Sequence, residues 1–120
     1  MIINVLFKLL VGHAVADFAL QSDSMARGKN RHRKTDPPPG AKYQPTWFYW
    51  LTAHSLIHGG MVFLATWSVG LGISETIAHW CIDFGKCENW YGVNIDQFLH
   101  FVCKLTWLYL FLVDKGYFYG

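Results

Sequence analysis

Four pairs of potential metal ligands are spaced along the chain at an interval that fits an α-helix. Each pair consists of histidine or aspartate residues four positions apart, and side chains at positions i and i+4 lie one above the other on the same helix face. The pairs are His13 with Asp17, His54 with His58, His79 with Asp83, and Asp96 with His100. Each pair therefore directs two ligands toward one region of space, and His32 is the one histidine that belongs to no pair.

Imidazole and carboxylate ligands without a thiolate predict a divalent transition metal. This set of ligands suits zinc, iron, manganese or nickel better than copper(I), and it does not suit calcium. Zinc is the first expectation, with manganese or iron as alternatives. Eight ligands exceed the four that a tetrahedral site uses, so we expect one or two ions. A proton relay built from the same histidines and aspartates is the main explanation that needs no metal.

Three further polar residues close to these ligands in the sequence are expected to bind substrate: Gln21, Lys86 and Gln97. The ammonium group of Lys86 is a compact charge on a long stem that could hold a phosphate, although snorkelling to a membrane interface explains this lysine equally well. The two glutamines could instead orient the ligands. The expected catalytic residues are Asp83, Lys86 and Asp96, with one aspartate as general base and the lysine as phosphate ligand.

The ligand pairs lie in four apolar stretches that predict membrane-spanning helices. The 120-residue chain is 52% hydrophobic and only 15% charged, whereas soluble domains carry about 25% charged residues. Residues 46–69 contain no Asp, Glu, Lys or Arg and are long enough to cross a hydrocarbon core about 30 Å thick, so they form the strongest predicted span. A turn is expected at 70–72. The four stretches cover residues 1–20, 46–69, 73–84 and 95–119.

These stretches predict an all-α integral membrane protein, a four-helix bundle in up-down-up-down order that forms a single domain over residues 1–120. The Pro-rich loop at about 22–45 carries six Lys or Arg residues against two acidic residues, so the positive-inside rule places it in the cytoplasm and both termini outside. This order puts all four ligand pairs at the end of the bundle that bears the basic loop. We expect a bacterial inner (plasma) membrane protein whose partner is the lipid bilayer. The net charge of +2 gives no reason to expect nucleic acid, and nothing in the sequence indicates an oligomeric state.

The runs that contain the ligand pairs resemble the domain-of-unknown-function family 3307, whose members are short membrane proteins of bacteria and phages. The resemblance rests on four runs in the same order and spacing: HAVADFALQ at 13–21, HSLIH at 54–58, HWCIDFGK at 79–86 and DQFLH at 96–100. The basic loop at 22–45 is not part of that pattern. The family is distantly similar to membrane-bound, metal-dependent hydrolases, so the resemblance implies a hydrolase.

Together these features predict a membrane-embedded, metal-dependent hydrolase that acts on a lipid-linked or membrane-delivered phosphoester, with a phospholipid or lipid phosphate as substrate. The metal would polarise a phosphoryl oxygen and lower the pKa of a bound water toward about 7. One alternative is a metal-ion or proton conduit, which needs polar residues through the outer half of the bundle, where Glu75 and Lys104 are among the few. Another is a metal-stabilised membrane interaction protein of phage origin that catalyses nothing.

Overall fold

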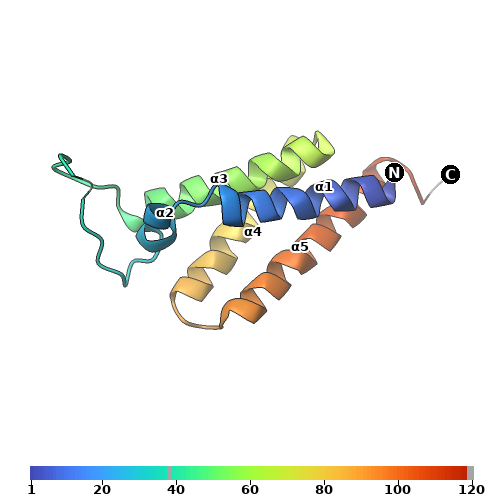
Figure 1. The fold of residues 1–120 in the computed structure, drawn as a ribbon. Coiled ribbons are helices and arrows are strands. Elements are labelled where there is room, and N and C mark those ends of the chain that lie inside the picture. The colour runs from blue at the N-terminus through green and yellow to red at the C-terminus, as the bar shows by residue number, and fades with distance from the viewer. Residues whose placement is uncertain (38, 119–120) are drawn as a thin grey trace.

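All the regular structure is helical in residues 1–37 and 39–118, which are the residues that the computed structural model describes (Figure 1). The all-α prediction is therefore confirmed. Helix α1 (Ile2–Ala14) continues directly into a π-helical segment, η1 (Val15–Ala19), and the short helix α2 (Asp23–Gly28) follows. The remaining helices are α3 (Trp47–Thr66), α4 (Val69–Cys87) and α5 (Val93–Asp114).

The long helices α1, α3, α4 and α5 pack side by side in a ring. α1 contacts α3 and α5, and α4 contacts the same two helices, with α3 as its more extensive neighbour. Both ends of the chain lie at one end of this ring, and α2 with the loop that follows lies at the other end (Figure 1). The interior near the termini is apolar, and its core consists of Val5, Leu9, Val62, Ala65, Leu108 and Leu112.

The break between α3 and α4 lies at Trp67 and Ser68. Trp67 ends α3 in the left-handed conformation, with a φ of 56°, and the hydroxyl of Ser68 accepts a hydrogen bond from a backbone N–H in the first turn of α4. The predicted turn at 70–72 is therefore wrong, and the helix predicted at 73–84 is present but longer at both ends. The serine cap starts α4 before the glycines, and the helix has 19 residues.

Gly59 of α3 and Gly72 of α4 allow these two helices to pack closely. A Cβ atom on Gly59 of α3 would lie 1.9 Å from the Thr76 hydroxyl oxygen and 2.5 Å from the carbonyl oxygen of Gly72, both on α4. Small residues at such a contact let two helix backbones approach closely. Because α3 and α4 each carry one predicted ligand pair, their close approach brings the two pairs toward each other.

The loop predicted at about 22–45 contains helix α2, which the sequence analysis does not anticipate. The hydroxyl of Ser22 caps this helix by accepting a hydrogen bond from the backbone N–H of Met25. Gly28 lies against the indole ring of Trp50 on α3, where a Cβ atom would come within 2.4 Å of a ring carbon. The first part of the basic loop is therefore folded against the bundle.

Two helical segments are long and apolar enough to span a membrane: Ile2–Ala19 and Val93–Asp114. Residues 46–69, predicted as the strongest span, are not among the segments that qualify by hydropathy within the described chain, so that prediction is not confirmed. α3 lacks formal charges, but its two histidines and its aromatic first turn lower its mean hydropathy. The last helix ends at Asp114, while Tyr119, its predicted end, lies outside the described residues.

The contact at Gly59 predicts that Gly59→Ala destabilises the protein while Gly60→Ala does not. The added methyl group on Gly59 meets Thr76 and the backbone of α4, and such overpacking costs about 1–3 kcal/mol. A Cβ atom on Gly60 meets nothing within 4 Å. The matched variant Gly60→Ala should therefore only raise helix propensity, which stabilises the protein by up to about 1 kcal/mol. Thermal unfolding in detergent measures both effects, and an equal loss of stability in the two variants would contradict the close-approach argument.

Candidate metal centre

The five paired histidines lie in one cluster, about one helical turn from the apolar core. The rings of His58 and His79 stack with their centroids 3.6 Å apart, and His100 stacks on His79 at 4.2 Å. His54 and His13 lie 4.7 and 5.1 Å from His58, centroid to centroid. The rings come from α1, α3, α4 and α5, so all four long helices contribute to a single group of imidazoles.

The carboxylates of the predicted pairs lie among these rings. Asp17 Oδ1 is 2.9 Å from His58 Nε2, and Asp83 Oδ1 is 3.2 Å from His100 Nε2. His54 Nε2 lies between two carboxylates, 3.4 Å from Asp17 Oδ1 and 3.4 Å from Asp83 Oδ2. The fold therefore brings together all eight predicted ligands, since the last one, Asp96 Oδ1, is 3.4 Å from His100 Nε2.

Several polar atoms of this cluster are buried without a hydrogen-bond partner among the described residues. They include the Nε2 atoms of His54 and His79 and the Oδ1 atom of Asp96. A buried polar atom without a partner costs about 1–3 kcal/mol, and buried polar groups normally have one. A cation at this point would coordinate lone pairs that the protein leaves unused, so the residues present fit a divalent ion.

The spacing of the atoms also fits coordination. Ligand atoms at about 2.1 Å from a tetrahedral ion lie about 3.4 Å from one another, which is the separation of His54 Nε2 from Asp17 Oδ1. Two groups with no member in common each have their ligand atoms within 4.8 Å of one another: Asp17, His54, His58 and His79 in one, and Asp83, Asp96 and His100 in the other. The arrangement therefore offers places for one or two ions.

Gln97 connects the ligands of α1 to those of α5. Its amide nitrogen donates hydrogen bonds to Asp17 Oδ2 and Asp96 Oδ2, at 3.1 and 3.2 Å, and its amide oxygen lies 3.1 Å from His13 Nε2. Gln97, which was predicted to bind substrate, thus contacts two predicted ligands from the α1 segment and one from α5, and it orients them. His13 lies in the cluster, but its Nε2 is engaged by Gln97 and belongs to neither coordination group.

The other two predicted substrate residues, Gln21 and Lys86, lie at the edge of the cluster. The amide nitrogen of Gln21 donates to the backbone oxygen of Asp17 at 3.3 Å, and its amide oxygen is buried without a partner in the described part of the chain. Lys86 is half-buried near the end of α4. Both side chains line a cavity beside the ligands.

Lys29 is a site residue that the sequence analysis missed. Its ammonium group donates a hydrogen bond of 2.5 Å to Asp83 Oδ2, and both side chains are buried. The sequence places Lys29 in the basic loop, 54 positions before Asp83, and no local spacing connects them. α2 brings this lysine to the cluster by packing against the bundle.

Glu75 and Lys104 form a buried ion pair deeper in the bundle, and neither residue was among the predicted site residues. Glu75 Oε1 lies 3.3 Å from His79 Nδ1, and the carboxylate also accepts hydrogen bonds from the Lys104 ammonium and the Trp107 indole. With Nδ1 protonated, His79 donates to Glu75 and its Nε2 lone pair faces Asp83, as in the carboxylate–histidine–metal arrangement. The sequence does contain a pattern that indicates this contact, because Glu75 and Lys104 each lie four positions from a predicted ligand.

Arg31 and Glu88 hold the basic loop against the end of α4. The Arg31 guanidinium donates hydrogen bonds of 2.6 and 2.9 Å to the Glu88 carboxylate, and His32 Nε2 lies 3.1 Å from it. The hydrogen bonds from Arg31 lower the pKa of Glu88 below its ordinary value. Because the folded-state pKa is lowered, the pair stabilises the loop at neutral pH, and this contribution is lost as the pH falls through that lowered pKa.

The contact with His79 predicts that Glu75→Gln weakens zinc binding about 10- to 100-fold, as loss of a carboxylate behind a histidine ligand does. Lys104→Gln is the matched control, because it breaks the same buried ion pair but leaves the carboxylate on His79. Competition with a chelator measures the zinc affinity of each variant, with circular dichroism to verify folding. Equal weakening in both variants would mean that Glu75 acts only through stability.

Comparison with known proteins gives one match. The model of the family described as "Protein of unknown function (DUF3307)" matches residues 5–116, a segment that contains all eight clustered ligands. No curated protein and no solved structure matches the chain significantly, so the expected distant similarity to membrane-bound hydrolases is not found. The family match covers nearly the whole sequence, and the chain therefore belongs to the DUF3307 family.

Proposed function

We propose that the protein is a membrane-embedded, metal-dependent hydrolase that acts on a lipid-linked or membrane-delivered phosphoester. The observation that carries this proposal is the convergence of eight imidazole and carboxylate side chains from four helices, with buried nitrogen and oxygen atoms that have no partner among the described residues. Buried ionisable groups in an apolar bundle are costly and are usually functional.

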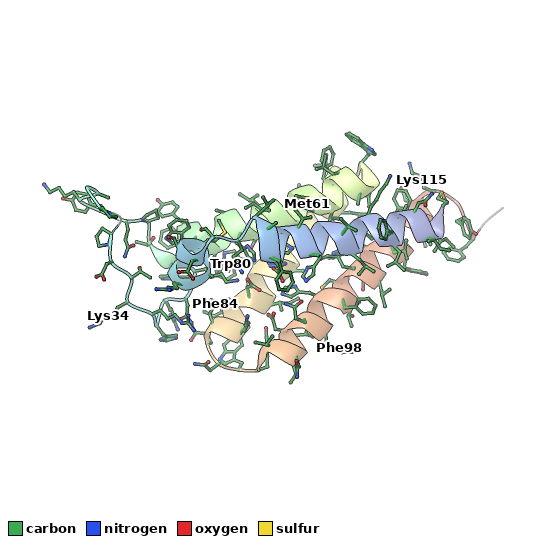
Figure 2. The ribbon with its side chains drawn as sticks, viewed as in Figure 1. Lys34, Met61, Trp80, Phe84, Phe98 and Lys115 are labelled. Carbon is green, nitrogen blue, oxygen red and sulfur yellow. The ribbon has the colours of Figure 1, made fainter. Side chains whose placement is uncertain are left out.

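The exposed surface supports insertion in a bilayer. Only 22% of the window in Ile2–Ala19 and 33% of that in Val93–Asp114 is buried inside the protein. Large apolar side chains point outward on every long helix, for example Phe7, Leu56, Ile77 and Phe98, and Figure 2 shows Phe98 projecting away from α5. Water would make such a surface unfavourable, whereas lipid suits it.

The topology that we propose has four antiparallel passes, formed by α1 with η1, α3, α4 and α5. The basic loop reaches the ligands, because Lys29 donates a hydrogen bond to Asp83, so we place the ligands in the half of the bundle nearer to that loop. The positive-inside rule favours the cytoplasmic side for the loop. The centre would then lie near the inner leaflet of a bacterial inner membrane, with both termini outside. A lipid-linked substrate could reach it from the bilayer.

We infer that Asp17, His54, His58 and His79 hold one ion and that Asp83, Asp96 and His100 hold a second, with zinc as the first candidate and manganese or iron as alternatives. When bound by these residues, a divalent ion would supply Lewis-acid chemistry, which would polarise a phosphoryl oxygen and lower the pKa of water toward neutral.

Asp96 is the better candidate for the general base. Its Oδ1 atom has no hydrogen-bond partner in the described residues, whereas Asp83 is bonded to Lys29 and His100. Gln97 fixes Asp96 through the other carboxylate oxygen, so the free oxygen is held in place to accept a proton. In that role Asp96 acts as base instead of holding the second ion, which Asp83 and His100 then hold, and Lys86 serves to hold the phosphate.

The apolar half of the bundle favours an enzyme over a conduit. Polar side chains continue from His79 to Glu75 and Lys104, but beyond them the interior of the described chain is the cluster of Val, Leu and Ala residues near the termini. A path for ions or protons needs polar groups or water through that region.

Metal analysis with a matched pair of histidine variants tests the metal centre. We expect one or two equivalents of metal in the detergent-purified protein and in His32→Ala, because His32 is exposed in the basic loop. His58→Ala, which removes a clustered ring, should lose metal. A folded parent protein that binds no metal, or a His32→Ala variant that loses as much as His58→Ala, would contradict the proposed centre.

Phosphate release from lipid phosphates in detergent micelles tests turnover. Loss of the metal in His58→Ala should lower the rate at least about a hundredfold, because a catalytic ion contributes several kcal/mol. Asp96→Asn should lower it by about 10² to 10⁴, the typical contribution of a general base, and the unfolding temperature shows whether this variant still folds. A metal-loaded parent protein that releases no phosphate from any lipid phosphate would favour the non-catalytic interaction protein.

A further inference from the structure

A cavity of about 320 Å³ lies beside the metal centre, where the start of the basic loop meets the turn between α4 and α5. Its polar wall consists of Gln21, Lys29, Asn30, Arg33, Lys86 and Asn89, and no lining residue is acidic. Three of these six side chains are cationic. The cavity is therefore a basic recess next to a cluster of metal ligands.

The positive charges of Arg33 and Lys86 in this cavity are not neutralised by a nearby carboxylate among the described residues. Elsewhere in the basic loop, Arg27 pairs with Asp23 at 2.7 Å and Arg31 pairs with Glu88 at 2.6 Å. Arg33 and Lys86, in contrast, have no carboxylate oxygen within 4.0 Å in the described part of the chain. Two free cations that line one recess attract an anion with several oxygen atoms.

Lys29 connects the cavity to the metal centre. Its side chain lines the cavity, and its ammonium group donates to Asp83. Without a metal, this lysine supplies the counter-charge that the buried carboxylate requires. A divalent ion held by Asp83 would take over that role, and the Lys29 ammonium could then donate to a ligand in the cavity.

Gln21 adds a neutral group at the same wall. Its amide oxygen is buried and has no partner in the described residues, while its amide nitrogen is held by the Asp17 backbone. The free oxygen is an acceptor. It would fit a ligand that carries a hydroxyl group or a protonated phosphate oxygen beside its anionic oxygens.

We propose that this cavity binds the phosphate group of a phosphate monoester, with Arg33 and Lys86 as its permanent cationic ligands and Lys29 as a third that becomes available when metal is bound. This inference rests on the proposed hydrolase function and names the group that the enzyme recognises. Metal and phosphate then strengthen each other's binding, because both draw on the interaction between Lys29 and Asp83.

The test measures binding of inorganic phosphate to the full-length protein in detergent by calorimetry, with and without zinc. Lys86→Gln and Arg33→Gln should each weaken binding about tenfold or more, because each removes a hydrogen bond between two charged groups, whereas Lys86→Arg should keep most of the affinity. Lys42→Gln is the matched control, since Lys42 is exposed in the same loop and lies against Tyr43. Zinc should tighten phosphate binding in the parent protein, and Lys29→Gln should remove that effect.

Two results would overturn the proposal: unchanged affinity in both Lys86→Gln and Arg33→Gln, or an equal loss in Lys42→Gln, which would indicate unspecific attraction to the loop. A parallel titration with bilayer discs of phosphatidylcholine, with and without phosphatidic acid, distinguishes the sources of phosphate. Tighter binding to phosphatidic acid than to inorganic phosphate assigns the site to a lipid headgroup, and equal binding assigns it to the phosphate group alone.

The failure of this inference is distinguishable from failure of the proposed function. If the protein binds metal and releases phosphate but neither Lys86→Gln nor Arg33→Gln changes phosphate binding or KM, only the cavity assignment fails. If phosphate binds with the expected dependence on Arg33 and Lys86 but no turnover occurs, the cavity assignment stands and the hydrolase proposal fails.

Discussion

The structure depends on compensation of buried negative charge inside an apolar bundle. Glu75 is matched by Lys104 and Asp83 by Lys29, so two of the carboxylates have a cationic partner of their own. Asp17 lies among three imidazoles and Asp96 beside that of His100, and both accept a hydrogen bond from the Gln97 amide. A buried carboxylate needs a counter-charge as well as hydrogen bonds, and this unequal compensation is the physical reason to expect a cation among the rings.

Close helix packing makes the cluster possible. Gly59 and Gly72 remove the side chains that would otherwise separate α3 from α4, and His58, next to Gly59 on α3, stacks on His79 of α4 at 3.6 Å. The same bundle is apolar near the termini and polar at the opposite end. Packing of the apolar end holds the four backbones in place, so the ligands at the other end are fixed by rigid elements.

The basic loop has a structural role in addition to its charge. α2 packs on α3, and the segment after it carries Lys29 into the interior and Arg31 to the end of α4. One lysine thereby touches a ligand of the centre and lines the adjoining cavity. The loop thus connects the exposed end of the structure to the buried cluster of ligands.

The sequence alone determined the helical class and the ligand pairs, because the i, i+4 spacing of His79 and Asp83 and the apolar stretches are local properties of a helix. It also contained Glu75 and Lys104, one helical turn from those ligands. Only the tertiary structure decided that Gly72 lies in a contact between two helices and not in a turn. It also decided that Lys29 reaches Asp83 and that Gln97 holds ligands together. Each of these contacts joins segments far apart in the chain, and local periodicity carries no information about such pairs.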